Sequence, residues 1–220
     1  MITNETLQLL KELAENNNRE WFHANRAAFD RAQDNMTAFV GQMIGEIGRF
    51  DTTITDLEPR SCIFRIYRDI RFSKDKSPYK THFGAYVAAG GRKSLAAGYY
   101  LHIEPNACFA AAGKYMPDRQ ELLRIRNAIE QNAERFKSIV ETRAFLKRFG
   151  TLAGDSLIRP PKGFAADSPV IEYLKLKSFM VHRIYSDAEV SAAAFYRSAA
   201  ADIKTAFPLV KFLRSAFERD

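Results

Sequence analysis

The sequence is poor in cysteine and lacks any long apolar run, and both features narrow the class of protein. Its 220 residues include two cysteines, Cys62 and Cys108, which are too few for a disulfide framework and form no CxxC metal motif. No apolar run approaches the ~18 residues of a membrane-spanning helix. The first ten residues are polar, carry Glu5 and lack the basic and apolar regions of a signal peptide. We therefore expect a cytoplasmic protein without a membrane partner.

The sequence also lacks the short motifs that identify common cofactor and catalytic sites. It contains no GxGxxG, HExxH or GxSxG pattern, which excludes the simple forms of dinucleotide binding, zinc proteolysis and serine hydrolysis. Two SxxK pairs, Ser73 with Lys76 and Ser77 with Lys80, have the spacing of serine acyl-enzymes but lack the accompanying motifs. We interpret both pairs as coincidental.

Composition and periodicity predict one domain over residues 1–220. With 46% hydrophobic and 27% charged residues, the chain can bury a core, and no linker divides it. Apolar residues at steps of three and four predict helices at both ends of the chain. We expect these helices over residues 3–16, 19–50, 118–142, 144–149, 170–176 and 186–207, with a last helix beginning at Pro208.

The centre of the chain alternates polar and apolar residues, which is typical of strands. We expect strands over residues 62–72, 82–89, 95–104 and 107–115, and a further short strand over 179–185. The fold class is therefore α+β, with a central antiparallel β-meander packed against long N-terminal and C-terminal helices.

All of the excess positive charge belongs to one segment. Residues 60–93 contain nine basic and two acidic residues, which equals the net charge of +7 for the whole chain. In the rest of the chain the basic and acidic residues are equal in number, so their charges sum to zero. A local concentration of this kind attracts anions, whereas a dispersed surplus affects mainly solubility.

The basic segment predicts an anion-binding pocket. Arginine can grip phosphate or carboxylate with two parallel hydrogen bonds, and lysine adds a compact charge. The expected partner is a phosphate-bearing or other anionic small molecule, and whether the molecule is also turned over stays open. The candidate ligand-binding residues are Arg65, Arg68, Arg71, Lys74, Lys76, Tyr79 and Lys80, joined by Lys162 from a proline-rich loop.

Titratable groups on the neighbouring predicted strands lie next to the basic residues if the polar faces of these strands align. Alternation places His82 on one strand and His102 with Glu104 on the next, facing Asp69. Asp69, His82 and His102 are therefore candidate catalytic groups, and the alternative is that the histidines are structural. The surrounding positive charge opposes a cation at Asp69, His102 and Glu104, so we expect no metal and no cofactor.

Two other functions compete with a small-molecule pocket. Aromatic residues alternate with basic ones through the segment, as in surfaces that track phosphates and stack bases, so a nucleic-acid-binding module is the main alternative. The third interpretation is a surface that docks an acidic partner protein. The oligomeric state stays open.

Residues 64–83 read FRIYRDIRFSKDKSPYKTHF, and this segment resembles the central motif of a family of uncharacterised bacterial and fungal proteins called domain of unknown function 2461. The resemblance extends over most of the chain and implies a single α+β domain, but it implies no activity. Its supporting pieces are Asn17-Asn18, Trp21-Phe22, the run from Gly98 to His102 and the run from Arg159 to Phe164.

Overall fold

The structure, a computed structural model, describes residues 1–152 and 154–217, in which the chain forms two compact units. Unit 1 contains residues 1–94, 100–110 and 184–201. Of the described residues, unit 2 contains 95–99, 111–152, 154–183 and 202–217. Among the described residues, none of the helices combines the length and the apolar character needed to cross a bilayer.

The α+β class and the antiparallel sheet are confirmed. The sheet has the strand order β1-β2-β3-β4, so consecutive strands are neighbours. Its strands are β1 (Phe83–Val87), β2 (Gly98–Ile103), β3 (Cys108–Lys114) and β4 (Phe179–Tyr185). Three of them fall within predicted central strands, and β4 matches the predicted short strand in both of its bounds.

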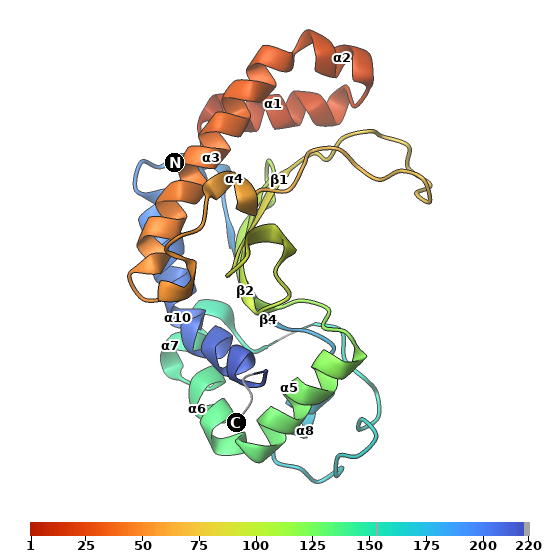
Figure 1. Cartoon of the computed structure of the whole chain (residues 1–220), viewed down its shortest axis with the longest axis vertical. Helices are drawn as coiled ribbons and strands as arrows, with labels where there is room; N and C mark the ends of the chain where they lie inside the picture. Colours follow the sequence, from red (N-terminus) through yellow and green to blue (C-terminus); the bar gives the residue numbers. More distant parts are fainter. Residues whose placement is uncertain (153, 218–220) are drawn as a thin grey trace. The chain divides into compact units, whose positions relative to one another are not determined.

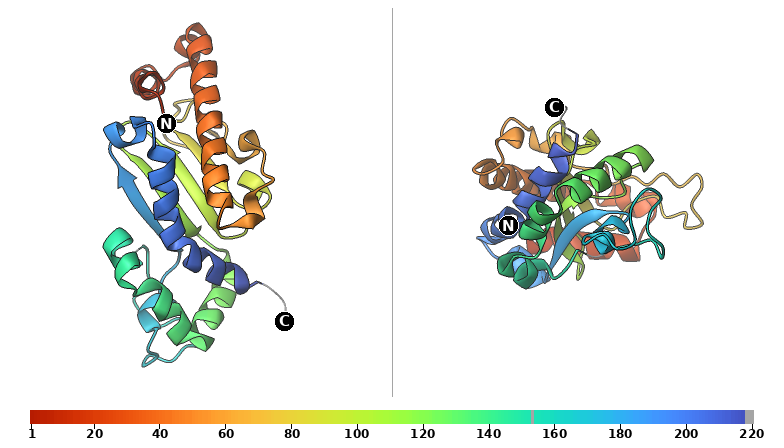
Figure 2. Two further views of the ribbon diagram at one scale, coloured as in Figure 1. Left: turned by 90° about the vertical axis from the view of Figure 1, so that its left-hand side faces the viewer. Right: turned by 90° about the horizontal axis from the view of Figure 1, so that it is seen from below.

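The longest helix of unit 1 is α3 (Arg26–Gly48). The shorter helical segments of the unit are α1 (Asn4–Glu15), α2 (Arg19–Ala24), η1 (Thr52–Ile54), α4 (Pro59–Cys62), η2 (Gly91–Lys93) and α9 (Asp187–Ser191). Helix α3 packs against α1, α2, α4 and strand β1 (Figures 1 and 2). Every third or fourth residue of α3 is apolar, and the resulting stripe is buried, which explains why this helix forms.

Asparagine residues divide helices that the apolar periodicity predicts as continuous. The side-chain amide of Asn25 donates to the Trp21 carbonyl at 2.9 Å, which ends α2 before α3 begins. Asn132 does the same to the Ala128 carbonyl at 2.9 Å, so the predicted helix over 118–142 becomes two. In both cases the backbone N–H of the same asparagine also donates to that carbonyl, so the side chain adds a second hydrogen bond at the helix end.

The predicted strand over residues 62–72 is wrong. Residues 64–80 instead form an extended excursion, which we call the arm, that leaves β1 and folds back on itself (Figure 1). Single antiparallel bridges join Tyr67 to Tyr79 and Ile63 to Ala85, without a regular ladder. Phe72, on the supposed apolar face, is 95% exposed, so burial does not hold this segment in a sheet.

Helices make up most of the regular structure of unit 2. They are α5 (Arg119–Gln131), α6 (Ala133–Val140), α7 (Arg143–Phe149) and α8 (Ile171–Leu174), together with the C-terminal part of α10 (Phe195–Ser215). The predicted break at Pro208 is wrong, because α10 continues through it. Buried residues on both sides of the proline, Ala206 and Leu209, keep the two halves on one packed face despite the lost hydrogen bond.

Candidate functional site

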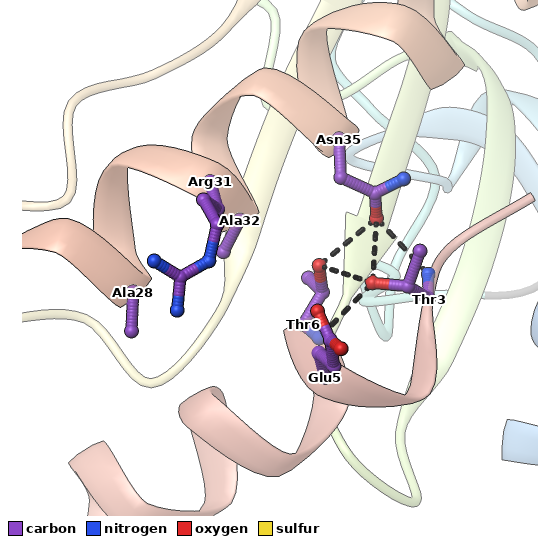
Figure 3. Close-up of a pocket in the computed structure, with 7 residues that line it drawn as sticks. All are labelled: Thr3, Glu5, Thr6, Ala28, Arg31, Ala32 and Asn35. Atoms are coloured by element: carbon purple, nitrogen blue, oxygen red, sulfur yellow. Dashed lines mark hydrogen bonds between the residues drawn. The ribbon is translucent and has the colours of Figure 1, made fainter.

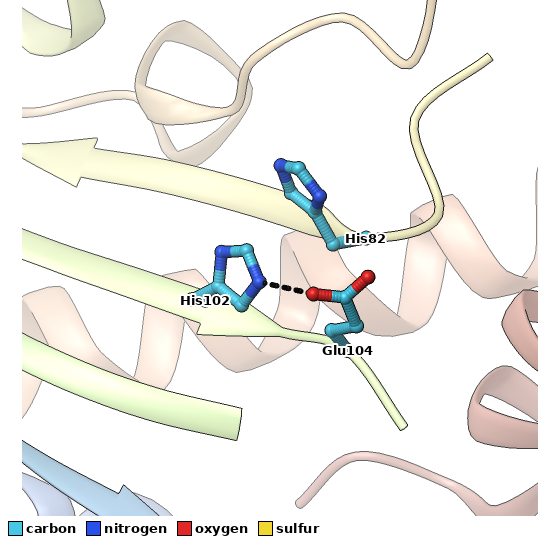
Figure 4. Close-up of side chains that lie close together, drawn as sticks. All are labelled: His82, His102 and Glu104. Carbon is cyan, nitrogen blue, oxygen red and sulfur yellow. Dashed lines mark hydrogen bonds and ion pairs between the residues drawn. The ribbon is translucent and has the colours of Figure 1, made fainter. Parts of the chain in front are cut away.

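Three titratable side chains converge where β1 and β2 lie side by side. His82 directly precedes β1, His102 lies in β2, and Glu104 follows that strand. Their side chains project from the same side of the two strands (Figure 4). One nitrogen or oxygen atom from each lies within 4.8 Å of the others. We call these three residues the histidine cluster.

Hydrogen bonds fix two members of the cluster. Nε2 of His102 lies 2.9 Å from a carboxylate oxygen of Glu104, and Nδ1 lies 3.2 Å from the Tyr100 hydroxyl. The other Glu104 oxygen accepts from the Thr81 hydroxyl at 2.6 Å. Both nitrogens of His102 and both oxygens of Glu104 therefore have a partner, which sets the orientation of each group.

Aromatic packing gives the cluster an apolar wall. The ring of Phe109, in β3, stacks on that of His102 with centroids 4.6 Å apart. The His82 ring lies 4.2 Å from His102, at an interplanar angle of 32°. Gly84 makes room for the network, because a Cβ there would lie 2.7 Å from the Tyr100 hydroxyl.

Burial and neighbouring charges shift the pKa of these groups. Burial, with His102 and Lys80, lowers the pKa of His82 to about 4. Burial alone would raise the pKa of Glu104, but hydrogen bonds from Thr81 and His102 outweigh it, so that pKa is lowered. At neutral pH the cluster therefore has a neutral His82 beside an ionised Glu104.

A cavity of about 380 Å³ is lined by the arm, by Thr81 and His82, and by residues at the end of α1. Thr81 and His82 belong both to this cavity and to the surroundings of Glu104 and His102. Two of the predicted anion-binding cations also line it, Arg68 and Lys80. We call it the arm cavity, and its remaining lining residues are Ala14, Asn17, Asp75, Ser77 and Tyr79.

Much of the positive charge of the arm is engaged internally. Arg68 pairs with Asp75 and donates to the Ser77 carbonyl at 3.2 Å. The Arg71 guanidinium grips both carboxylate oxygens of Asp69, at 2.9 and 2.7 Å. These contacts close the arm on itself, so a net charge counted from the sequence overstates the charge available to a ligand.

Lys80 is the exception among the cations that line the arm cavity. Its ammonium lies 5.5 Å from the centre of the Phe64 ring, and no carboxylate pairs with it among the residues that the structure describes. The side chain is half-buried, and burial lowers its pKa, with Arg65 adding to the effect. A positive charge that has lost water without gaining an acid is a ready partner for an anion.

The other predicted site residues are dispersed. Asp69 is exposed in the arm, and no contact joins it to either histidine within the described part of the chain. Lys76 donates to the Ile70 carbonyl at 3.1 Å, while Arg65 and Lys74 are exposed. Lys162 belongs to unit 2, in the loop between α7 and α8. Tyr79 is buried and stacks on Phe22.

Sequence reasoning assigned no role to several residues that support the site. Thr81 holds Glu104, Tyr100 holds His102, and Asn17 lines the arm cavity. Asn17 and Tyr100 lie in the motif pieces that carry the family resemblance. Alternation also places Tyr100 on the same strand face as His102 and Glu104. For Thr81 the sequence carries no signal, because its partner is 23 residues away.

The chain matches a family model described as "Conserved hypothetical protein (DUF2461)" over residues 5–212. The chain belongs to the DUF2461 family. The resemblance based on residues 64–83 and its supporting pieces is therefore confirmed. No curated protein and no solved structure matches the chain. The DUF2461 match covers both units and carries no activity.

A second, smaller cavity of about 170 Å³ lies between α1 and α3. Three of its polar lining residues are joined by hydrogen bonds (Figure 3). The Asn35 side-chain oxygen accepts from the Thr3 amide at 3.0 Å and from the Thr6 hydroxyl at 2.9 Å. These bonds tie the first turn of α1, where Thr3 is the N-cap, to α3. They account for the polar groups of Thr3, Thr6 and Asn35, while the charged side chains of Glu5 and Arg31 also line this cavity.

Proposed function

We propose that this DUF2461 protein binds a small phosphate-bearing or otherwise anionic molecule in the arm cavity. Lys80 supplies the principal charge and Arg68 a second donor group. The observation that carries the proposal is the position of Lys80, which is half-buried at the cavity wall without a carboxylate partner among the described residues. An anion there would restore the electrostatic stabilisation that the ammonium loses on burial.

Several neighbours favour an anion over a neutral ligand. The Arg68 guanidinium is held in place by Asp75 and the Ser77 carbonyl, so little side-chain entropy is lost when it donates to a ligand. The Asp75 carboxylate, which also lines the cavity, offsets the charge of Arg68 and leaves Lys80 as the net positive charge of the arm cavity. The imidazole of His82 also lines the arm cavity. A volume of about 380 Å³ suits a small metabolite and is too small to enclose a polymer.

Thermal unfolding against a panel of anions tests this proposal. The panel contains inorganic phosphate, nucleotides, sugar phosphates and polycarboxylates, each at low and at moderate salt. A ligand at 100 times its dissociation constant stabilises the native state by ~2.7 kcal/mol, which shifts the Tm of a chain of this length by roughly 5–10 °C. Absence of any shift across the panel would contradict the proposal.

Matched charge variants locate the site. Lys80→Gln should abolish the shift, because it removes the unpaired charge from the cavity wall. Lys93→Gln removes the same charge from an exposed position of the basic segment outside the cavity, so it should retain the shift. Equal shifts in the two variants would show that the anion does not bind at Lys80.

One observation favours nucleic acid as a second candidate. Phe72 is 95% exposed in the arm, and the Arg71 guanidinium lies 5.8 Å from the centre of its ring. An exposed aromatic residue beside a cation is what base stacking on a phosphate-tracking surface uses. This candidate requires stabilisation by short single-stranded oligonucleotides that falls steeply with salt and is lost in Phe72→Ala.

A further inference from the structure

We propose that the histidine cluster is a binding site for a divalent transition-metal ion of the zinc class, with His82, His102 and Glu104 as its ligands. This inference goes beyond the proposed anion binding and does not depend on it. Two imidazoles and one carboxylate are a ligand set suited to zinc and iron(II), whereas calcium and magnesium prefer oxygen ligands throughout.

The spacing of the ligand atoms fits an ion of this size. Ligands 2.0–2.1 Å from a tetrahedral ion are about 3.3 Å apart. Nε2 of His102 and the nearer oxygen of Glu104 are 2.9 Å apart, and all three ligand atoms lie within 4.8 Å of one another. The widest separation thus exceeds the tetrahedral spacing by at most about 1.5 Å, a difference that rotation of the side chains about their χ angles can close.

The groups behind the ligands match the outer partners of known metal centres. A histidine that coordinates through one nitrogen usually donates through the other, which fixes its orientation. When Nε2 of His102 faces the ion, Nδ1 faces the Tyr100 hydroxyl at 3.2 Å. The second oxygen of Glu104 is held by Thr81 at 2.6 Å. Both ligands are thus oriented before an ion arrives.

Local charge weakens the objection that the basic segment would repel a cation. Arg68 and Arg71 are each paired with an aspartate in the arm, and Glu104 contributes a negative charge within the cluster. Lys80 is the nearby cation that acts on His82, and it lies on the wall of the arm cavity. Three protein ligands leave at least one coordination position open, and His82 lies at the cavity edge.

Zinc retention by the full chain tests the site. The protein is stripped with a chelator, incubated with Zn²⁺, dialysed and analysed for bound metal, in buffer without phosphate. We expect one zinc ion per chain in the wild type and at least tenfold weaker binding in His82→Ala and Glu104→Gln. His23→Ala removes an exposed histidine of α2 and should bind as the wild type does.

Two variants distinguish a loss of zinc binding from a loss of folding. Glu104→Gln keeps the shape of the side chain and an acceptor for Thr81, so its loss of zinc reports the ligand rather than the fold. Tyr100→Phe leaves all three ligands in place and should weaken zinc binding about 10-fold through the orientation of His102. Co²⁺ substitution should give visible absorption bands that disappear in His82→Ala.

Wild-type protein that retains no zinc would overturn the proposal, as would equal retention in the wild type, His82→Ala and Glu104→Gln. The outcome is separable from that of the anion proposal. Phosphate stabilisation of the metal-free protein tests the arm cavity alone, and zinc retention without phosphate tests the histidine cluster alone.

Discussion

Asn17 and Tyr79 exchange two hydrogen bonds across 62 positions of sequence. The Asn17 side-chain amide donates to the Tyr79 carbonyl at 2.9 Å, and the Tyr79 backbone amide donates to the Asn17 side-chain oxygen at 3.1 Å. One side chain thereby satisfies both backbone groups of a buried residue, as a neighbouring strand would. This pair attaches the end of the arm to the helical part of unit 1.

The Asn17–Tyr79 pair predicts a stability effect. Asn17→Ala leaves two backbone groups of Tyr79 unpaired and should lower the free energy of unfolding by about 1–3 kcal/mol. Chemical denaturation measures the change, and the Tyr79 amide should exchange faster with solvent. Asn17→Asp keeps the acceptor but loses the donor, so it should lie between the wild type and Asn17→Ala. An unchanged exchange rate in Asn17→Ala would contradict this role.

The Asp75 carboxyl should titrate at unusually low pH. Hydrogen bonds from the Ser77 hydroxyl and amide, and then from Arg68, lower its pKa to about 2. Because the folded-state pKa lies below the ordinary value of 3.8, this carboxylate stabilises the arm above pH 4. The contribution is lost as the pH falls toward 2.

Carboxyl titration by NMR checks the Asp75 prediction. Ser77→Ala removes the hydroxyl donor and should move the Asp75 pKa toward its ordinary value. Ser73→Ala is the control, because Ser73 contacts Arg68 and does not contact Asp75 among the described hydrogen bonds. A wild-type pKa near 4 would mean that the arm does not close in this way.

Gly84 and Tyr100 should be energetically coupled. Gly84→Ala places a Cβ 2.7 Å from the Tyr100 hydroxyl, so the ring must shift, and we expect a loss of about 1–3 kcal/mol. In a Tyr100→Phe background the hydroxyl is absent and the same substitution should cost less. Urea denaturation of the four proteins gives the coupling energy. Additive effects would contradict the close contact.

Asp202 is the buried acidic centre of unit 2. Its side chain is 3% exposed and pairs with Arg148 at 2.6 Å and with Arg183 at 2.9 Å. Asp202→Ala removes the carboxylate from two arginines whose side chains are 40% and 33% exposed, and we expect a loss of about 1.5–3 kcal/mol in unfolding free energy. Glu172→Gln changes an acid whose side chain is 78% exposed, in a pair with Lys175, and should change stability by less than about 1 kcal/mol. Equal effects would contradict the burial of Asp202.

The sequence predicted those elements whose stabilisation is local. Strand β4 has the predicted bounds. The helix predicted to begin at residue 186 does begin there, because Ser186 and Glu189, which are neighbours in sequence, form a capping box. The strand expected over residues 62–72 failed because its alternation does not reflect burial. The conformation of the arm is held by contacts such as those of Arg68 with Asp75 and Ser77. The alternation of polar and apolar residues gives no indication of these contacts.

The sequence indicated which residues belong to the candidate site better than it indicated how those residues are arranged. Alternation placed His82, His102 and Glu104 on one face, and the structure brings these three side chains together, with His82 directly before β1. It separates Asp69 from them, because the Arg71 guanidinium holds that carboxylate in the arm. Strand register and arm closure depend on contacts between distant residues, which a single sequence does not reveal.

NMR titration of the lysine side chains with inorganic phosphate measures whether Lys80 receives an anion. At moderate salt, we expect the Lys80 side-chain signals to move along a saturable curve, while those of Lys93 move little. Saturable shifts at Lys80 that disappear in Arg68→Ala would show that Arg68 also binds the anion. If all lysine signals move alike and without saturation, or do not move, then Lys80 does not bind the anion.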